Sequence, residues 1–469
     1  MNNMNYWELR KLVSKIIPRL SVFVEERDKQ SLVKEKGRKS NYFQFDLEKG
    51  EMIKKERLLN LEEMQSFIEV SLRSQACPMS LNLDIYDSKL CPYRCRYCFA
   101  DYARASLYSS FFDNTKGMGM RVCSPDFFKK ELTELFKHRG SKKDLADVSK
   151  AIAMEMPLRL GIRFEDFVRP IETKNRIALE MLNFLADAEY PIMVNTKSDL
   201  VGDDEYVKAF ARNRAGAAVH VTMISSNEAF LKGLEPGAPT FKERIRGCKN
   251  LCDAGVRVVA RIEPFMVFLN DEKGMTDDYI EQILEAGIRH MTFDCYSYSA
   301  AGSGIKNSFA RLGHDFERMY EMMSKAQFLG SLLLGKYMDY FRQCGIECST
   351  FDAGNVPTND DDICCSVSDL FGRAKFCSGN TTSAIRFIVS RKGAKTAWSD
   401  FEKWVNEGNG FLSNSFRDEV KHLWNLMGDT SFSIDWAAGL RPVGQDRDGL
   451  VWVYDPKYDF REEMLRRVV

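Results

Sequence analysis

The chain has 469 residues, of which 44% are hydrophobic and 29% are charged, a composition typical of a folded globular protein with two or three domains. Lys and Arg together number 67, as do Asp and Glu, and this balance excludes a global positive field that would hold nucleic acid non-specifically. The first residues lack the apolar core of a signal peptide, and no run of about 18 apolar residues occurs. The sequence therefore predicts a cytoplasmic protein without a membrane span.

Three regions follow one another along the chain. Residues 1–75 are rich in charge and carry amphipathic helical patterns, which predicts a helical amino-terminal extension. Residues 76–310 alternate strand-like apolar runs with helical periods. Residues 311–469 begin with a helical stretch and continue with mixed patterns, which predicts an α+β carboxy-terminal extension. In that last region we expect a strand over 384–389, a helix over 397–405 and a hairpin around 446–449.

The central region determines the expected fold class, which is α/β. Its predicted strands cover 80–87, 158–162, 191–196, 217–223, 256–262 and 290–295. The predicted helices between them cover 125–139, 174–188, 203–212, 240–254 and 276–286. Such alternation is typical of right-handed parallel βαβ units. Because there are six repeats, it indicates a partial (β/α)6 barrel rather than a closed eight-fold barrel.

The most informative motif is a loop with three closely spaced cysteines, Cys91, Cys95 and Cys98, directly after the first predicted strand. Chemistry in α/β folds gathers at the carboxyl ends of the strands. Three thiolates on one loop can bind a soft metal centre. They cannot fill the four protein ligand positions of an iron–sulfur cluster, so one iron would stay open. The alternative is a structural zinc site, which would need a fourth Cys or His nearby.

The spacing Cys-x3-Cys-x2-Cys, with Tyr97 before the last cysteine and Phe99 after it, resembles the cluster motif of the radical S-adenosylmethionine (SAM) enzymes. The resemblance implies that the three cysteines hold a 4Fe–4S cluster whose open iron binds SAM. An electron from a flavodoxin or ferredoxin type of donor would then cleave SAM to a 5′-deoxyadenosyl radical that abstracts hydrogen from a substrate. It also implies a barrel of the radical SAM type.

Further stretches resemble the spore photoproduct lyase branch of that family. They are Glu165-Asp166-x3-Pro170-x-Glu172, Asn195-Thr196-Lys197-Ser198-Asp199, Thr222, Leu234 to Thr240 with Arg244, and Glu263-Pro264 with Asn270-Asp271. By this resemblance, Lys197 pairs with the SAM carboxylate, and Glu165 with Asp166 holds its ribose or amino end.

The same resemblance gives four more residues a place at SAM, with Tyr97 near the adenine and Thr222 making a polar contact. Phe99 and Arg261 complete the expected cofactor-binding set. The alternatives stay open: Lys197 could cap the turn at Asp199, Thr222 could reflect β-propensity, and Arg261 could be a salt-bridge residue.

Arg163 marks a departure from the lyase branch, which carries a cysteine at this position as a hydrogen donor. A guanidinium group does not donate a hydrogen atom, so the DNA repair reaction of the lyase is not expected here as such. Arg163 is instead a catalytic candidate that would bind an anionic group through a bidentate contact.

A second group of thiols lies in the carboxy-terminal region and comprises Cys344, Cys348, Cys364, Cys365 and Cys377. They could ligate an auxiliary iron–sulfur cluster or a zinc ion. The alternative is a set of buried thiols without a metal, because free cysteine is among the most buried residue types.

The resemblance leads to a first hypothesis, a radical SAM enzyme that modifies or repairs a nucleobase or nucleotide in DNA or RNA. A basic and aromatic stretch could bind the nucleic acid; it contains Tyr102, Arg104, Tyr108, Phe111, Phe112, Arg121, Lys129, Lys130, Lys137, Arg139, Lys142 and Lys143. The alternative for this stretch is a solvated helix face. A second hypothesis is radical modification of a peptide or protein side chain. A third is an iron–sulfur or zinc module that is not an enzyme.

Overall fold

The computed structural model describes residues 81–83, 85–87, 91–98, 121–122, 125–142, 145, 147–162, 164–266, 269–270, 275–276, 278–296, 303–311, 313, 315–317, 327–351, 360–361, 363–376, 381–410, 412, 417–426 and 439–458. The expected helical extension over 1–75 lies outside these residues, as do Phe99, Arg163 and Cys377. In the part of the chain that is described, no helix is long and apolar enough to cross a membrane.

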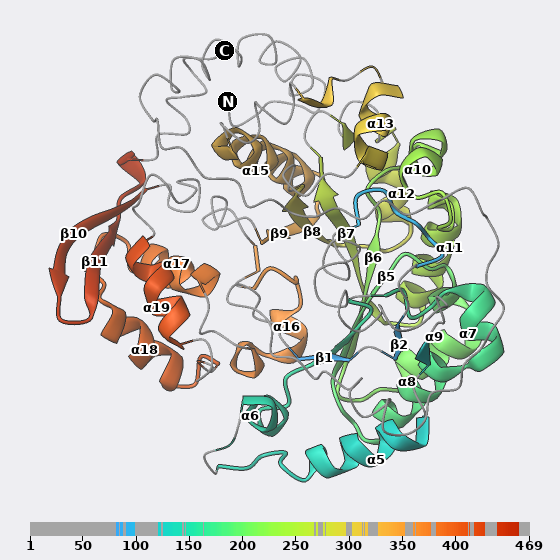
Figure 1. Ribbon diagram of the computed structural model, residues 1–469, viewed down its shortest axis with the longest axis horizontal. Helices are drawn as coiled ribbons and strands as arrows, with labels where there is room; N and C mark the ends of the chain where they lie inside the picture. The colour runs from blue at the N-terminus through green and yellow to red at the C-terminus, as the bar shows by residue number, and fades with distance from the viewer. Residues whose placement is uncertain are drawn as a thin grey trace, which may run out of the picture.

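A seven-stranded sheet with the order β1-β4-β5-β6-β7-β8-β9 forms the centre of the molecule (Figure 1). Its strands are β1 (Asn82–Leu83), β4 (Leu158–Leu160), β5 (Ile192–Thr196), β6 (Ala217–Thr222), β7 (Arg257–Phe265), β8 (His290–Cys295) and β9 (Glu347–Thr350). Every neighbouring pair is parallel. No ladder joins β1 to β9 among the described strands. The expected α/β fold with parallel βαβ units is confirmed, with an open sheet.

Helices connect these strands and cover one face of the sheet. They are α5 (Pro125–Phe136), α6 (Asp147–Ala153), α7 (Arg169–Asn175), α8 (Ile177–Asp187), α9 (Asp204–Ala211), α10 (Glu228–Leu234), α11 (Phe241–Asp253), α12 (Tyr279–Glu285), α13 (Ser303–Arg311) and α15 (Gln327–Gln343). Local sequence sets several of their ends. The clearest case is α11, where the side chains of Thr240 and Glu243 form a reciprocal capping box.

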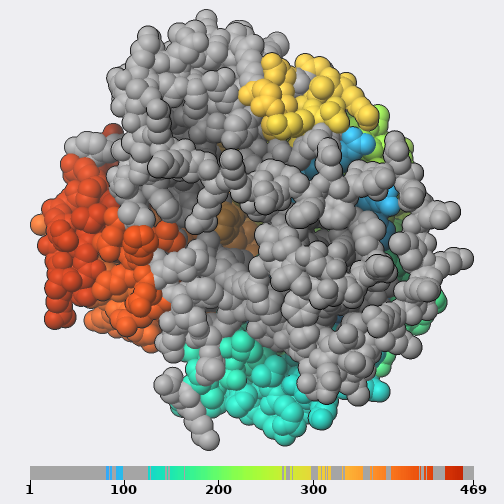
Figure 2. Space-filling view, viewed as in Figure 1, coloured from blue at the N-terminus to red at the C-terminus, as the bar shows by residue number. Residues whose placement is uncertain are grey.

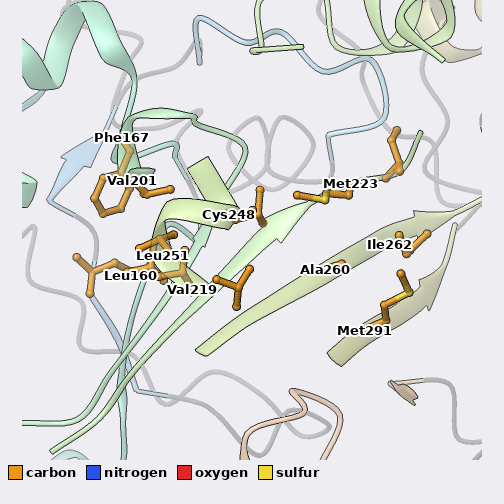
Figure 3. Packing of buried hydrophobic residues seen from close by; sticks show 14 of the residues in the cluster. Leu160, Phe167, Val201, Val219, Met223, Cys248, Leu251, Ala260, Ile262 and Met291 are labelled. Carbon is orange, nitrogen blue, oxygen red and sulfur yellow. The ribbon is translucent and has the colours of Figure 1, made fainter. Parts of the chain in front are cut away.

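The two faces of the sheet differ because side chains alternate along each strand. The outer face packs its apolar side chains against the helices in the main core (Figure 3), with Leu160, Val219, Ala260, Ile262 and Met291 among them. On the inner face, Met193, Ala218 and Val259 pack against residues 363–376, which we call the inner segment. This segment contains the short helix α16 (Ser368–Phe371), which Figure 1 shows on the side of the sheet opposite to α8, α9 and α11.

Several sequence-based expectations need correction. The sheet has a seventh strand, β9, which lies beyond the expected domain boundary at 310. The first predicted strand, 80–87, is divided into β1 and β2 (Tyr86–Asp87), and β2 pairs antiparallel with β3 (Arg121–Val122). The expected strand over 384–389 is wrong, because it lies inside helix α17 (Thr381–Ser390). A short apolar run does not distinguish a strand from a buried helix.

The last part of the chain has its own small core. Helices α17, α18 (Trp398–Asn406) and α19 (Arg417–Leu426) pack with the hairpin of β10 (Leu440–Asp446) and β11 (Gly449–Tyr454) around Trp398, Trp424 and Trp452. The expected helix over 397–405 and the hairpin around 446–449 are confirmed. Figure 2 shows these orange and red elements gathered on one side of the molecule.

Candidate functional site

The cysteine loop lies beyond the carboxyl ends of the sheet strands and is built from two turns. The backbone N–H of Arg94 donates to the carbonyl of Cys91 at 3.1 Å, and that of Cys98 donates to the carbonyl of Cys95 at 3.2 Å. None of the three cysteines is in a disulfide within the described structure; Cys95 is buried and the other two are half-buried. The local fold therefore presents three cysteine side chains on one short loop.

A second segment, residues 234–240, holds this loop in place. The N–H of Arg96 donates to the carbonyl of Leu234 at 2.9 Å, and the N–H of Gly237 donates to the carbonyl of Tyr93 at 3.1 Å. A Cβ atom on Gly237 would lie 2.2 Å from the carbonyl oxygen of Pro92. Only glycine permits this approach without a shift of the backbone. The stretch that resembled the lyase branch in sequence is thus a direct support of the cysteine loop.

A buried ionic network lies under the loop. The Tyr97 hydroxyl donates to the Glu235 carboxylate, which also forms a salt bridge with Arg244. The side chains of Arg244 and Glu235 are 1% and 0% exposed. Arg244 also donates to the carbonyl oxygens of Thr222 at 2.8 Å and of Pro239 at 3.0 Å. The network connects the cysteine loop, helix α11 and the end of β6 through one guanidinium group.

Lys197 follows β5 and extends over the same site. Its Nζ lies 3.4 Å from Thr222 Oγ1 and 5.5 Å from the centre of the Tyr97 ring. Burial lowers the pKa of Lys197, but Cys95 and Glu235 outweigh that effect and raise it, so the ammonium is charged at neutral pH. Among the described residues, no salt bridge joins Lys197 to a carboxylate. The structure therefore brings Tyr97, Lys197 and Thr222 together as the sequence predicted.

Glu165 and Asp166 stabilise the loop after β4. Glu165 is buried and accepts hydrogen bonds from Thr196 Oγ1 at 2.5 Å, from the N–H of Lys197 at 2.7 Å and from the N–H of Phe167 at 3.2 Å. Asp166 is also buried, and its Oδ2 accepts from the N–H of Gly161 at 2.8 Å. These contacts fix the backbone that carries Lys197. A direct contact of either carboxylate with SAM stays a prediction.

Arg261 lies on the inner face of β7, in register with Thr222 on β6. It forms a salt bridge with Glu263, whose other oxygen accepts from Thr292 Oγ1 at 3.0 Å. Burial lowers the pKa of Arg261, but Glu263 outweighs it and raises the pKa. The salt-bridge alternative is therefore confirmed for this residue, and its contact with a cofactor stays a prediction.

Three described thiols of the second group lie on different sides of the sheet. Cys348 lies in the main core on the outer face of the sheet, whereas Cys364 and Cys365 belong to the inner segment, with 3.9 Å between their sulfur atoms. The seven-stranded sheet separates Cys348 from the other two. Cys377 lies outside the described residues, and an auxiliary metal centre at thiols of this group stays a prediction.

The basic residues proposed to bind nucleic acid are in part engaged elsewhere. Lys129 pairs with Glu180, Lys137 with Glu134, and Arg139 with Glu155 at 2.6 Å. These contacts favour the alternative of a solvated helix face for α5 and the turns that follow it. The aromatic residues from 102 to 112 lie outside the described part of the chain.

The donor set at the loop fits a 4Fe–4S cluster. Three cysteines lie on one short loop. Burial raises the pKa of the Cys95 thiol well above its usual value, and Lys197 offsets part of that rise. Metal binding would deprotonate such a thiol. Among the described residues, no three His, Cys, Asp or Glu side chains are grouped to hold a single metal ion. In a 4Fe–4S cluster each thiolate binds its own iron, so the three sulfur atoms need not meet at one ion.

Sequence reasoning missed three residues of this region. Glu235 and Asn195 belong to stretches that resemble the lyase branch, but neither was given a role there. Glu235 lies nine residues before Arg244, its partner in the structure. Asn195 and His220 belong to predicted strands, and the structure places both on the inner face, in register with each other. Their polar character within otherwise apolar strands was the available signal.

Comparisons with known proteins found no family model and no curated protein that matches this chain. Among solved structures, a spore photoproduct lyase complexed with dinucleoside spore photoproduct is similar with 14% identity and a TM-score of 0.38, over 52% of this chain and 65% of the lyase. The chain thus spans somewhat less than two thirds of that enzyme's length.

Two other solved structures are also similar. Streptococcus suis SuiB bound to precursor peptide SuiA has 12% identity and a TM-score of 0.37, over 63% of this chain and 55% of SuiB. The cobalamin-dependent S-adenosylmethionine radical enzyme OxsB has 16% identity and a TM-score of 0.29, over 51% of this chain and 30% of OxsB.

Proposed function

We propose that this protein is a radical SAM enzyme that acts on a nucleobase or nucleotide. The observation that carries the proposal is the position of Lys197, a partly buried ammonium beside the cysteine loop. Cys95, Glu235 and Cys98 raise its pKa, against the effect of burial. A cation in this position needs a negative partner, and the carboxylate of SAM on the open iron would supply one.

Different residues of the chain would bind the cluster and the different parts of SAM. Cys91, Cys95 and Cys98 would hold the 4Fe–4S cluster, and Lys197 with Thr222 would orient the methionine part of SAM. Tyr97, fixed by Glu235, would border the adenine. When bound, the cluster supplies the electron that cleaves SAM. The burial of Tyr97 and Cys95 would keep water away from the reactive species formed there.

The substrate class rests on the sequence resemblance to the lyase branch. The stretches that carry it, above all 234–240 with Arg244, form the support of the cysteine loop. Arg163 is proposed to bind an anionic group of the substrate, such as a phosphate. Because this arginine stands where the lyase has its hydrogen donor, we propose a modification reaction in preference to repair of the spore photoproduct. The electron donor would be a flavodoxin or ferredoxin.

The test is anaerobic turnover of the reconstituted protein with SAM and a reductant. Candidate nucleosides and short oligonucleotides, deuterated in base or sugar, are added one at a time, and mass spectrometry measures the deuterium in 5′-deoxyadenosine. We expect deuterium transfer from a nucleoside or oligonucleotide. If 5′-deoxyadenosine forms at the same rate without them and never gains deuterium, the nucleobase substrate is wrong. Transfer from a deuterated peptide library instead would favour a peptide substrate.

A further inference from the structure

The inner face across β5 and β6 carries three successive layers of side chains. Met193 and Ala218 are in register at the bottom, and Asn195 and His220 are in register above them. Lys197 and Thr222 follow at the top, 3.4 Å apart. Two residues along a strand advance the chain by about 6–7 Å. Asn195 and His220 therefore lie one layer below the proposed SAM site.

The layer below is closed by the chain itself. Met193 and Ala218 pack against the inner segment, whose Ile363, Val367 and Phe371 are buried with them in one apolar cluster. Val259 belongs to the same cluster but lies one layer higher, in register with His220. Ser349 on β9 also donates to the carbonyl of Cys364 in this segment at 3.1 Å. Asn195 and His220 thus lie directly above the apolar pair of Met193 and Ala218, which Arg159 and Arg257 flank in register.

Both side chains leave a polar atom unsatisfied. Asn195 is 5% exposed and His220 is 2% exposed. Within the described structure, Asn195 Oδ1 and His220 Nε2 are buried and have no hydrogen-bond partner. An unsatisfied buried polar atom is costly, and native proteins rarely keep one without a reason. Two such atoms on register neighbours, beside the proposed reaction site, point to a ligand that bonds both.

The two unsatisfied groups are themselves neutral. Burial lowers the pKa of His220, and Arg261 and Arg159 lower it further, so the imidazole is uncharged at neutral pH. The nearby cations already have partners: Arg261 pairs with Glu263, and Arg159 Nε donates to Asn82 Oδ1 at 2.8 Å. Asn195 Oδ1 and His220 Nε2 therefore require hydrogen-bond partners rather than a counter-ion.

The spacing of the two side chains selects the shape of the ligand. Asn195 Oδ1 accepts a hydrogen bond, and His220 Nε2 donates one in the tautomer that carries its proton there. Adjacent strands lie about 4.8 Å apart, so a group that bonds both atoms presents its donor and acceptor on the same edge. A trans peptide unit points its N–H and C=O to opposite sides. A lactam ring of a nucleobase has both on one edge, and enzymes that act on a base commonly recognise this edge. We infer that Asn195 and His220 hydrogen-bond the lactam edge of a nucleobase substrate, an inference that rests on the proposed function.

Equilibrium binding tests this inference without turnover. Uridine, guanosine and single-stranded oligonucleotides that contain them are titrated calorimetrically into the anaerobic, cluster-loaded full chain with SAM. Their N3-methyluridine and N1-methylguanosine counterparts, in which a methyl group blocks the lactam N–H, are titrated in parallel. We expect at least one lactam ligand to bind about tenfold more tightly than its methylated counterpart. Comparing the affinities for free nucleosides and for oligonucleotides shows whether the site binds a free nucleoside or a base within a strand.

Asn195→Leu and His220→Leu are expected to abolish this preference. Stability separates a binding role from a structural one. Because Asn195→Leu removes an unsatisfied atom, its melting temperature should equal or exceed that of the unchanged protein. The matched control is Asn213→Leu. Asn213 is also buried, but its Nδ2 donates to the carbonyl of Tyr190 at 2.9 Å and its Oδ1 accepts from the N–H of Ala215 at 3.0 Å. This control should melt at a lower temperature.

Three results would overturn the inference. One is equal affinity for every lactam ligand and its methylated counterpart, including the case in which none binds. Another is an unchanged preference in Asn195→Leu and His220→Leu. The third is a loss of melting temperature in Asn195→Leu as large as in Asn213→Leu. If the protein binds its cluster and cleaves SAM but gives one of these three results, only the lactam inference fails. Failure to bind a cluster or to cleave SAM would instead contradict the proposed radical chemistry.

Discussion

At the scale of single residues, Lys197 has the clearest predicted effect. Its ammonium group lies beside Thr222 and over the Tyr97 ring, where the SAM carboxylate is proposed to bind. Lys197→Met removes the charge and keeps much of the length. Because truncation of one partner of a buried charge pair costs about 2–5 kcal/mol, we expect the Kd for SAM to rise at least about 30-fold. Equilibrium dialysis with labelled SAM measures it.

Lys208→Met is the matched control, because Lys208 lies exposed on α9. It should leave the Kd for SAM unchanged within about twofold, since surface charges contribute little. If Lys197→Met binds SAM as tightly as the control does, Lys197 does not contact the SAM carboxylate.

The buried pair of Glu235 and Arg244 gives a second residue-scale prediction. Removing one partner leaves the other charge buried and unpaired, which costs about 3–5 kcal/mol. We therefore expect Glu235→Gln and Arg244→Met each to lower the free energy of unfolding by about that amount in urea titrations. The double variant should lose much less than the sum of the two.

The exposed pair of Lys249 and Asp253, 3.0 Å apart on α11, serves as the control. Lys249→Met should change the free energy of unfolding by only about 0.3–0.5 kcal/mol. Additive losses for Glu235→Gln and Arg244→Met would mean that the two side chains do not act as a coupled pair.

At the scale of elements, the cysteine loop depends on its contact with residues 234–240. Gly237→Ala would place a methyl group 2.2 Å from the carbonyl oxygen of Pro92, so the loop must shift. We expect the variant to retain less iron after anaerobic reconstitution than the unchanged protein, as measured by a colorimetric iron assay.

Gly233→Ala tests the same substitution where space is free. Gly233 lies in helix α10, and a Cβ atom added to it would have no neighbouring atom within 4 Å among the described residues. Alanine favours a helix over glycine by about 1 kcal/mol, so stability should rise and iron content should stay the same. Equal iron contents in the two variants would contradict the role given to residue 237.

Sequence and structure agree best where an element has a long, clear pattern. The strands at 191–196 and 217–223 were predicted within a residue or two, because both are largely apolar runs before helices. The short strand β9, with four residues, has no such pattern. Helix α17 resembles a strand because its apolar run is short and rich in β-branched residues.

The candidate site was predictable to the extent that local motifs define it. Cys91, Cys95, Cys98 and Lys197 follow strand ends, and Thr222 is the last residue of β6. Parallel strands bring their carboxyl ends to one edge. The partners Glu235 and Arg244 depend on how α10 and α11 return to the cysteine loop. Such tertiary contacts produce no periodic pattern in the sequence, so only the structure showed the roles of Glu235 and Arg244.

At the scale of the whole molecule, the central claim is that one loop binds one redox cluster that in turn binds SAM. Among the described thiols, Cys348 is separated from Cys364 and Cys365 by the sheet. We therefore expect about four iron and four sulfide per chain, the content of one 4Fe–4S cluster. Cys348→Ala should leave this content unchanged, and a value near eight would indicate a second cluster.

The most direct test is electron paramagnetic resonance of the dithionite-reduced, reconstituted protein before and after SAM is added. The account predicts a reduced 4Fe–4S signal whose g-values shift with SAM, and 5′-deoxyadenosine in the same samples. Cys95→Ala should lose signal and product, whereas Cys252→Ala, which changes a thiol on α11, should keep both. A cluster signal whose g-values do not change when SAM is added would contradict the central claim. So would a Cys95→Ala variant that forms as much 5′-deoxyadenosine as the unchanged protein.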